Sequence, residues 1–514
     1  MSPGLTVEQA SSHLSNHVIL PLMPYYLGAD IGTTNVKALL VDGCQRIIAQ
    51  GSEPVPTLRR RAGWSEQHPE AWWSAFTKIC SALRRQAPRQ WADIAAIGLA
   101  GQMHACLCLD KRNRPLRPAI LWDDGRAFSE CSALAASVPD LRDIVGVAPM
   151  PGFTAPKLFW LARHEPQNFD RIAHVLLAKD YVRWKLTGEH VTDVSDAAGS
   201  LLLDQRSRQW SPPVLAAIGL ATLPLPRLVE GTASAGVVSA AVSRRLGLNS
   251  KTIVAGGGGD AAAGAVGIGA VDEGNSFISL GTSAQYFRVR NDYRLPSHPT
   301  IHAFAHCLPG RWYEMAALLN GASCLAWITR LLGITSLETA LKEVRQNLGS
   351  PSSLLFLPYL AGERTPLNDP TLRAMLLGVS HTTTRTDLLH AVLEGVALAL
   401  ADVQSCLDTP GSPLAIIGGG ARSLPWVQII ADVLGRELVV YREAAAAAAF
   451  GAARLARMAS TGETVNALCT KPPALKRLKP RPAAHELYSR RLDLFRQAQA
   501  ALLVAKAHQD QERT

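Results

Sequence analysis

Apolar positions along this chain alternate between short strand-like runs and longer helix-like stretches. An apolar run that begins at Tyr25 reaches a glycine turn at Gly32 and resumes over residues 36–41. A helix-like stretch begins near Pro69, and an apolar strand over residues 94–99 follows it. Strands that alternate with helices in this way predict an α/β layered domain.

The same strand, turn and strand pattern returns in the middle of the chain. Apolar residues lead into Asp30-Ile31-Gly32-Thr33-Thr34 in the first copy and into Leu280-Gly281-Thr282-Ser283 in the second. Each copy predicts a β-hairpin, the second over residues 277–289. Glycine lets a backbone approach an anion closely, and N–H groups with Thr or Ser hydroxyls donate to phosphate oxygens. The repeat therefore predicts two similar halves that hold one nucleotide through Gly32, Thr33, Thr34, Gly281 and Thr282.

Later elements follow the same alternation. Helices are predicted near 316–332, over 386–402 and over 425–434, and a strand over 414–417. The alanine run 444–449 is expected to open one more helix, and the charged last stretch is expected to be helical.

Asp260 is the strongest candidate for a catalytic group. A predicted strand over 252–255 enters the run Gly256-Gly257-Gly258-Gly259, which places Asp260 at or near a helix N-terminus with little bulk around it. A carboxylate there can accept a hydroxyl proton during phosphoryl transfer. Asp is also a favoured helix N-cap, so the segment alone leaves both roles open. The two phosphate hairpins favour catalysis.

Two charged residues flank the first hairpin turn. Asp30 is placed to hold Mg²⁺, directly or through water, against a polyphosphate, although a turn aspartate that bonds its own backbone is the alternative. Lys37 is placed to neutralise a terminal phosphate, or else is an exposed strand lysine. Gly418, Gly419 and Gly420 follow a predicted strand and offer a flat surface to an adenine or ribose, unless they form a turn without a ligand.

The predicted strand over 94–99 ends in Gly101-Gln102-Met103-His104. Backbone groups and an imidazole at such a tip suit a polyhydroxylated ligand, although a histidine at a strand end is often structural. Trp122 stands beside a charged loop, where an aromatic ring can serve as a platform for a sugar. The other tryptophans read as core residues.

Composition narrows the class of protein. A chain of 514 residues with 47% hydrophobic and 18% charged residues is expected to fold into two or three globular domains. Its net charge of +10 is dispersed without interleaved aromatics, which disfavours a nucleic-acid site and suits anionic substrates. No apolar stretch is long enough to span a membrane, and the first 24 residues do not read as a secretory signal, so a cytoplasmic protein is expected. The nine cysteines form no Cys-x-x-Cys pair and are expected to be reduced.

Seven short motifs together resemble the FGGY family of carbohydrate kinases, from about Tyr25 to about Arg457. They are Trp64-Ser65-Glu66-Gln67, Gly101-Gln102-Met103-His104, Pro118-Ala119-Ile120-Leu121-Trp122, Pro151-Gly152-Phe153-Thr154-Ala155-Pro156-Lys157-Leu158, Ser195-Asp196-Ala197-Ala198-Gly199, Leu280-Gly281-Thr282-Ser283 and Gly362-Glu363-Arg364-Thr365-Pro366. The resemblance implies an actin-like, ribonuclease H-like α/β fold of two lobes with a central cleft. It also implies transfer of the γ-phosphate of ATP to the 5-hydroxyl of D-xylulose, and it makes a homodimer plausible.

The resemblance also implies a division of the chain and a set of roles. Residues 1–24 are expected to be an extension, 25–270 a sugar-binding lobe with the first phosphate hairpin, 271–457 a nucleotide-binding lobe and 458–514 a helical tail. Asp260 matches the catalytic base and Asp30 the carboxylate that governs Mg-ATP. Met103 and His104 match the xylulose-contacting pair, and residue chemistry adds Gln102 and Trp122 to the sugar side. Gly281 and Thr282 match the second phosphate loop and Gly419 and Gly420 the adenosine segment. Residue chemistry adds Gly32, Thr33, Thr34 and Lys37 to the nucleotide side.

Three departures from the family pattern bear on specificity. Ala261 stands where an Asn is usual after the catalytic Asp, so one polar contact to the sugar is expected to be missing. Ala105 stands where a Gly is usual, and the run 444–449 replaces a turn that contains glycine and proline. These departures leave open a kinase for another pentulose or polyol, or a catalytically weak sugar- or nucleotide-binding regulator. An actin-like or chaperone-like ATPase is disfavoured, because it leaves the Gln-Met-His segment unexplained.

Overall fold

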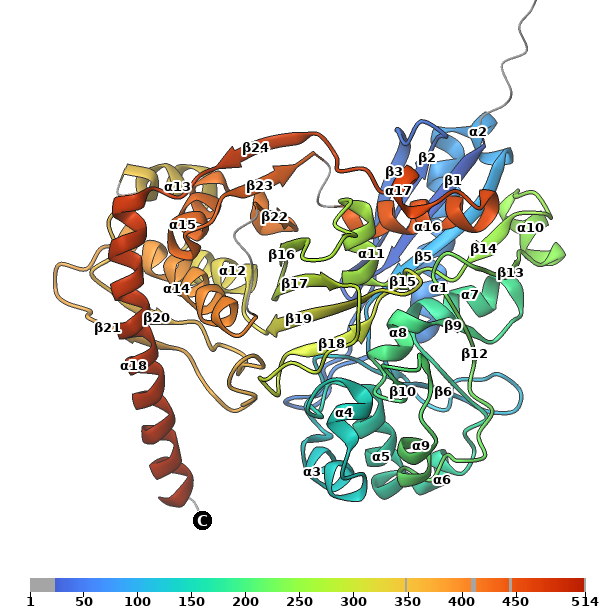
Figure 1. Ribbon diagram of the computed structural model, residues 1–514, viewed down its shortest axis with the longest axis horizontal. Coiled ribbons are helices and arrows are strands. Elements are labelled where there is room, and N and C mark those ends of the chain that lie inside the picture. Colours follow the sequence, from blue (N-terminus) through green and yellow to red (C-terminus); the bar gives the residue numbers. More distant parts are fainter. Residues whose placement is uncertain (1–23, 347–348, 408–412, 443–445, 513–514) are drawn as a thin grey trace, which may run out of the picture.

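The computed structural model describes residues 24–346, 349–407, 413–442 and 446–512, so the expected extension lies outside the described residues except for residue 24. Two seven-stranded sheets, each covered by helices, dominate the described part of the chain (Figure 1). In that part no helix is long and apolar enough to cross a membrane.

The first sheet is built on the predicted hairpin of β1 and β2. β1 pairs antiparallel with β2, which pairs with β3, while its other edge pairs parallel with β5 and then β14. The strands of this sheet are β1 (Tyr25–Ile31), β2 (Asn35–Val41), β3 (Ile47–Pro54), β5 (Ile94–Gly101), β13 (Ser234–Val237), β14 (Ile253–Ala255) and β15 (Gly258–Gly259).

The second sheet repeats this plan. β16 forms the predicted hairpin with β17, which pairs with β19, and the other edge of β16 pairs parallel with β22 and then β23. The prediction of two similar halves is therefore confirmed. The strands are β16 (Ser276–Leu280), β17 (Ala284–Arg290), β18 (His302–Ala305), β19 (Trp312–Leu318), β22 (Leu414–Ile417), β23 (Leu438–Tyr441) and β24 (Ala474–Leu478).

Helix α1 (Pro69–Gln86) covers the outer face of the first sheet. Its proline stands in the first turn, where the missing N–H costs no intrahelical bond. Trp72, Phe76, Ile79 and Leu83 recur at helical spacing and are all buried, which gives the helix one apolar face. The same layer contains α2 (Pro88–Ala92), α7 (Ala178–Thr187) and α10 (Ala240–Leu246).

Apart from α7, the helices between β5 and β13 form a separate region beside the first sheet, in teal and green in Figure 1. Its helices are α3 (Phe128–Ser137), α4 (Leu141–Val145), α5 (Thr154–His164), α6 (Pro166–Phe169), α8 (Val194–Ala198) and α9 (Pro212–Ala217). Short strands join it to the sheet and to the segment before α1: β4 (Glu66–Gln67), β6 (Leu107–Leu109), β7 (Ala119–Ile120), β8 (His174–Leu176), β9 (Val191–Asp193), β10 (Leu203–Asp204), β11 (Gln209–Trp210) and β12 (Arg227–Val229).

The helices of the second half bury their apolar side chains against the second sheet. Helix α14 begins with a capping box in which the Thr384 hydroxyl and the Asp387 carboxylate satisfy each other's backbone N–H groups. Helix α18 runs along the outer side of this half and buries Tyr488 and Phe495 in its core (Figure 1). The elements are α12 (Ala322–Leu331), α13 (Leu337–Gln346), β20 (Leu355–Leu357), β21 (Met375–Leu377), α14 (Arg385–Ser405), the 3₁₀ helix η1 (Gly419–Arg422), α15 (Leu424–Leu434), α17 (Val465–Leu468) and α18 (Pro482–Glu512).

Two helices with small side chains lie between the sheets. In α11 (Asp260–Gly267) and α16 (Ala447–Thr461) the backbones touch, because a Cβ on Gly451 would lie 1.8 Å from the Ala263 carbonyl oxygen. Helix α16 also rests on the first sheet, where a Cβ on Gly98 would lie 1.8 Å from the Ala452 oxygen. Only glycine and alanine allow packing this close. Helix α16 therefore packs directly on both α11 and the first sheet.

One predicted element is wrong. The helix expected near 316–332 is in fact β19 followed by α12. Ala316 and Ala317, which favour helices by themselves, lie in β19 with Tyr286 and Gln285 of β17 as cross-strand partners. Pairing of β19 with β17 and β18 decides the conformation here, because tertiary contacts override a local preference of roughly a few tenths of a kcal/mol.

Candidate active site

The two candidate acids lie at the carboxyl edge of the first sheet. β5 separates β1 from β15, and Ala100 of β5 pairs with both Asp30 and Gly258. Asp260 follows two residues later as the first residue of α11. The glycine turn predicted from the sequence thus brings Asp260 to the same edge as Asp30.

Burial raises the pKa of both carboxyls. Burial raises the pKa of Asp260 to about 7, with a further contribution from the charge of Asp30, while the Ala261 N–H, 2.8 Å from Oδ1, opposes the shift. Burial raises the pKa of Asp30 to about 6, and the ammonium of Lys37 opposes it. A carboxyl whose pKa lies near neutrality is suited to accept a proton at physiological pH.

Asp30 fits the role of a cation ligand. Its Oδ1 is buried and has no hydrogen-bond partner among the described residues. Within the same residues, no three His, Cys, Asp or Glu side chains gather into a metal cage. This donor set fits Mg²⁺, which is usually held by one or two carboxylates together with substrate phosphates and water.

The first hairpin tip is tied to the sugar-side candidates. Gly32 permits the turn, since a Cβ there would lie 2.8 Å from the Asn35 carbonyl oxygen. The Thr33 hydroxyl donates to Gln102 Oε1 at 2.9 Å and accepts from Trp122 Nε1 at 2.9 Å. Thr33, expected on the nucleotide side, therefore links the phosphate turn to Gln102 and Trp122.

Gln67 supports this link and was given no role from the sequence. Its Nε2 donates to the Thr33 carbonyl at 2.6 Å, and its Oε1 accepts from Gln102 Nε2 at 3.0 Å and from Trp72 Nε1 at 2.7 Å. Trp72, read as a core residue, thus has a polar partner at the base of the site. The Trp-Ser-Glu-Gln motif was a family marker, but only the fold reveals these contacts.

His104 is held in one tautomer and in a strained backbone conformation. Its φ of 70° lies in the left-handed region. Nδ1 lies 2.6 Å from the Gly199 carbonyl, which can only accept, so Nδ1 carries the proton and Nε2 keeps a lone pair. Burial, with the charge of Arg364, holds the pKa of the imidazole well below its usual value. His104 is therefore a neutral ring with one free acceptor.

Two residues that the sequence marked only as family positions fix the His104 backbone. Its carbonyl accepts from Lys157 Nζ at 2.9 Å and from Thr154 Oγ1 at 3.2 Å. Burial lowers the pKa of Lys157 to about 7. A strained conformation that is held by several contacts is typical of functional sites.

Met103 connects the site to the second half of the chain. A Cβ on Gly259 would lie 2.8 Å from Met103 Sδ, so the thioether rests directly against the segment that carries Asp260. The hydroxyl of Tyr313, in β19, lies 3.8 Å from the same sulfur. Burial, and then the charge of Asp260, raise the pKa of Tyr313. Tyr313 thus belongs to the surroundings of Asp260, although no local motif marked it.

Trp122 is the second point of contact between the halves. Arg364, from the loop after β20, donates to the Trp122 carbonyl and places its guanidinium 5.3 Å from the centre of the indole ring. Burial lowers the pKa of Arg364 to about 10. Cation and ring are thus held together across the two halves.

The nucleotide-side glycines gather at the carboxyl edge of the second sheet. The carbonyls of Gly281 and Thr282, at the tip of the β16–β17 hairpin, accept from the first N–H groups of α12, at Ala322 and Gly321, at 2.7 and 3.1 Å. In η1, which follows the neighbouring strand β22, a Cβ on Gly420 would lie 2.5 Å from Leu280 Cγ. The second phosphate tip and the glycine run are thus next to each other, as parallel pairing of β16 and β22 requires.

The candidates therefore form two groups, one at each sheet. Helix α11 links them, because it begins at Asp260 and packs Gly264 towards Ile417, the residue before the glycine run. Lys37 lies exposed on β2, in register with Asp30. The roles assigned to the candidate residues of both groups stay predictions.

The departures from the family pattern lie in packed surroundings. Ala261 is 5% exposed, and Ala105 is fully buried in the core beside α1. Of the run 444–449, residues 444 and 445 lie outside the described residues, and the carbonyl of Ala449 rests on Gly28 of β1.

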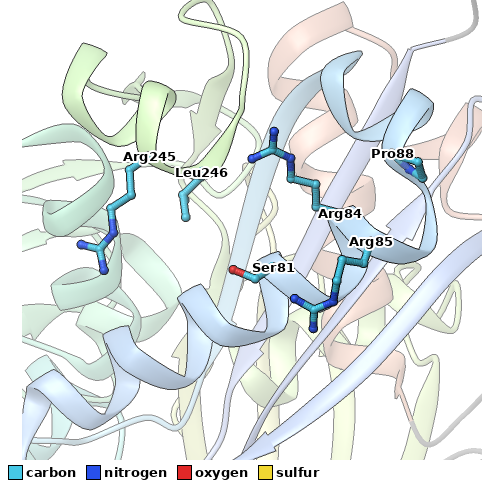
Figure 2. Close-up of a pocket in the computed structure, with 6 residues that line it drawn as sticks. All are labelled: Ser81, Arg84, Arg85, Pro88, Arg245 and Leu246. Atoms are coloured by element: carbon cyan, nitrogen blue, oxygen red, sulfur yellow. The ribbon is translucent and has the colours of Figure 1, made fainter.

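A surface hollow of about 430 Å³ lies elsewhere, between α1 and α10 (Figure 2). It is lined by Ser81, Arg84, Arg85, Pro88, Arg245 and Leu246. Three of these are arginines in the last turns of the two helices, where cations favour the negative end of the helix dipole. Their position is explained without a ligand.

Both halves of the chain match models of one protein family. The models for the N-terminal and C-terminal domains of the FGGY family of carbohydrate kinases match residues 25–267 and 276–460. The chain is 42% identical to a xylulose kinase of Escherichia coli (strain K12), over 93% of this chain and 99% of that protein. It is 41% identical to a xylulose kinase of Klebsiella pneumoniae, over 91% and 95%.

Solved structures agree with the two-sheet plan. A crystal structure described as a xyloylose kinase from Brucella ovis superposes with a TM-score of 0.88 and is 41% identical. The match covers 94% of this chain and 100% of that chain. A gluconate kinase from Lactobacillus acidophilus, at 24% identity, has a TM-score of 0.85 over 93% and 98%, a likeness of fold alone. These likenesses confirm the expected two-lobed, actin-like α/β fold.

Proposed function

The chain belongs to the FGGY family of carbohydrate kinases, and on that premise we propose that it transfers the γ-phosphate of ATP to the 5-hydroxyl of D-xylulose. One observation carries the chemistry: Asp260 and Asp30 share a sheet edge beside Met103 and His104. The choice of sugar is supported by the similarity to xylulose kinases over almost the whole length of the chain.

Asp260 acts as the general base in this proposal. Its carboxylate takes the proton of the sugar hydroxyl while the oxygen bonds to phosphorus and the bond to ADP breaks. A pKa of about 7 means that a large share of the carboxyls is ionised near neutrality, yet each binds a proton far more strongly than an exposed Asp. Positioned proton acceptance of this kind contributes about 10²- to 10⁴-fold to rate.

The sugar is assigned to the surface formed by Gln102, Met103, His104 and Trp122. His104 offers the Nε2 lone pair to a sugar hydroxyl, since its Nδ1–H is already used by Gly199. Gln102 and Trp122 are held through Thr33, which couples the orientation of the sugar side to the first phosphate turn. Such coupling favours an arrangement in which both substrates are aligned together.

The nucleotide is assigned to the backbone N–H groups at both hairpin tips and to Gly419 and Gly420. Thr34 and Thr282 supply hydroxyls, and Lys37 supplies a positive charge. Kinases of this family use ATP and typically a divalent metal; here Mg²⁺ would be held by Asp30, directly or through water. When bound, Mg²⁺ neutralises charge on the phosphates.

Exclusion of water is the last requirement, because water competes with the sugar hydroxyl for the phosphoryl group. The contact between Arg364 and Trp122 joins the halves on the sugar side. We assign it the role of holding the lobes together over the bound sugar.

The proposal is tested by ADP release over a panel of ketoses and polyols, with the product identified by mass spectrometry and NMR. We expect the highest kcat/KM with D-xylulose and a phosphate on its 5-hydroxyl. Absence of ADP release above the protein-only rate with every sugar would overturn the assignment as a kinase.

A second candidate is a kinase of the same family for another pentulose or polyol. Ala261 favours it, because the missing side-chain amide beside Asp260 removes a hydrogen-bonding group that discriminates between sugars. The same panel decides, since a different sugar with a higher kcat/KM than D-xylulose would support this candidate.

A further inference from the structure

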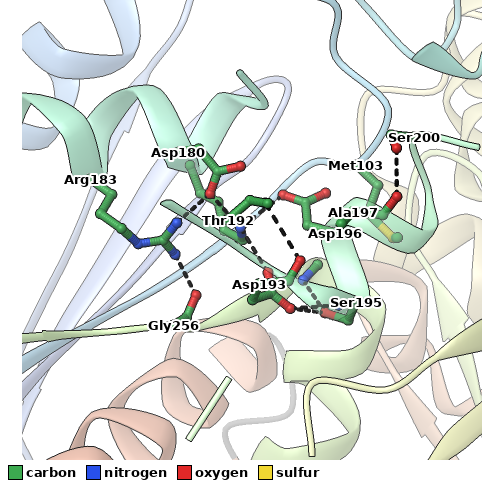
Figure 3. A network of polar contacts seen from close by, with 12 residues as sticks. Met103, Asp180, Arg183, Thr192, Asp193, Ser195, Asp196, Ala197, Ser200 and Gly256 are labelled. Atoms are coloured by element: carbon green, nitrogen blue, oxygen red, sulfur yellow. Dashed lines mark hydrogen bonds and ion pairs between the residues drawn. The ribbon is translucent and has the colours of Figure 1, made fainter. Parts of the chain in front are cut away.

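A buried ionic network lies beside the glycine segment that carries Asp260 (Figure 3). Its centre is Lys179, whose ammonium lies 2.7 Å from Asp180 Oδ1, 2.8 Å from Asp193 Oδ1 and 3.1 Å from Asp196 Oδ2. These four side chains are at most 1% exposed and come from α7, β9 and α8.

The network reaches the glycine segment at both ends. At the far end, Arg183 donates to the Gly256 carbonyl. At the near end, the Gly259 N–H donates to the Ser195 hydroxyl oxygen at 3.0 Å. Glycines have no side chain to fix them, so these backbone contacts, together with pairing to β5, set where the following residue, Asp260, points.

The Ser195 hydroxyl has only one orientation available. Its proton goes to Asp193 Oδ2 at 2.5 Å, and the same oxygen accepts the Ser195 backbone N–H at 2.8 Å. The other oxygen of Asp193 faces Lys179. A hydroxyl that donates to Asp193 turns its lone pairs away from it, which leaves them for the Gly259 N–H.

Stability alone is a weak explanation for this network. Three carboxylates face two cations, and burial, reinforced by the charges of Asp180 and Asp193 and opposed by Lys179, raises the pKa of Asp196 well above its usual value. Apolar residues of similar volume would stabilise a core at least as well as buried ion pairs. What buried, hydrogen-bonded charges provide better is a fixed geometry.

We propose that Ser195 is a positioning residue for Asp260, oriented by Asp193 and Lys179 and acting through the Gly259 N–H. The proposal rests on the function proposed above, in which Asp260 is the base. It assigns to the Ser-Asp-Ala-Ala-Gly segment a role in aligning the reacting group. Groups that orient metal ligands are typically worth about 10- to 100-fold in affinity or activity, and we expect an effect of the same order for a group that orients a base.

The test compares steady-state kinetics of the full chain with Mg-ATP and D-xylulose for the wild type, Ser195→Ala and Ser195→Cys. We expect Ser195→Ala to lower kcat about 10- to 100-fold while the KM of each substrate changes less than about threefold, because binding groups are untouched. Ser195→Cys is expected to fall between the two, since sulfur accepts hydrogen bonds weakly.

Ser243→Ala is the matched control. The Ser243 hydroxyl is also buried and donates to the Leu248 carbonyl at 2.7 Å, but in α10, away from Asp260. The Ser243→Ala variant should be less stable than the wild type but keep its kcat. Thermal denaturation of every variant confirms that assays are run on folded protein, and Ser195→Cys carries the decision if Ser195→Ala does not fold.

The outcomes separate the two proposals. A wild type without activity on any sugar overturns the proposed function. A wild type with activity, together with folded Ser195 variants whose kcat stays within about twofold of it, overturns the positioning role. A loss confined to KM, or an equal loss of kcat in Ser243→Ala, also overturns it.

Discussion

Replacement of Asp260 by Asn should stabilise the protein at alkaline pH while it abolishes phosphoryl transfer. The wild-type carboxyl has a pKa of about 7, against an ordinary value of 3.8. Between these values the folded protein binds a proton that the unfolded chain does not, so the free energy of unfolding falls as pH rises through this window. Above the folded-state pKa the protein has lost all of this stability, and below the ordinary pKa it has lost none of it.

The size of the effect follows from the shift. Each pKa unit is worth about 1.36 kcal/mol, so a shift of about three units corresponds to about 4 kcal/mol for a fully buried group. Asp260 is partly exposed, and solvent screening reduces the expectation to about 2 kcal/mol. More than half of this loss falls between about pH 5 and about pH 8. The Asn variant has no carboxyl at this position, so its free energy of unfolding should not show this loss.

Urea denaturation of the wild type and Asp260→Asn at about pH 5 and about pH 8 measures the difference. We expect the stability of the variant relative to the wild type to rise by about 1–2 kcal/mol between the two conditions. Asp140→Asn, at an exposed position whose side chain makes no cap hydrogen bond, is the control and should show no such rise. If the difference in stability between Asp260→Asn and the wild type were equal at both pH values, the inference that the fold raises the pKa of this carboxyl would be refuted.

Three further predictions concern the site and its frame. Asp260→Ala should bind ATP with wild-type affinity by calorimetry yet lose turnover by about 100-fold or more, and near-normal turnover would show that it is not the base. His104→Ala should raise the KM for the sugar about tenfold and leave the KM for ATP unchanged, because one hydrogen bond to the sugar is lost. Gly98→Ala should cost about 1–3 kcal/mol, because its methyl would lie 1.8 Å from the Ala452 oxygen; Gly264→Ala, whose nearest neighbour would be 3.8 Å away, is the control.

Local sequence patterns predicted the elements that carry the site. Both hairpins were expected from a glycine turn between apolar runs, and the structure has them over β1–β2 and β16–β17. The position of Asp260 after a strand and a glycine run was likewise predictable, because each feature depends on neighbours in the sequence. The candidates for the sugar side came from the chemistry of the strand-end residues and from the family motifs, and their role stays a prediction.

Contacts between distant segments could not be predicted in this way. Ser195 meets Gly259, and Tyr313 meets Met103, only after strands from different parts of the chain have been placed. For the same reason β19 was mistaken for a helix, since its pairing with β17 and β18 is not written in its own residues. Residues that act through such contacts carry no signal in a single sequence.

The packing of α16 on the first sheet has a consequence for folding during synthesis on the ribosome. The face of the first sheet around Gly28 and Gly98 is covered by α16, which ends at Thr461, more than 350 residues beyond Gly98. This face of the first sheet therefore stays uncovered until the chain has been synthesised through α16. A fragment truncated before α16 should consequently be a substrate for chaperones and should not accumulate as a folded half.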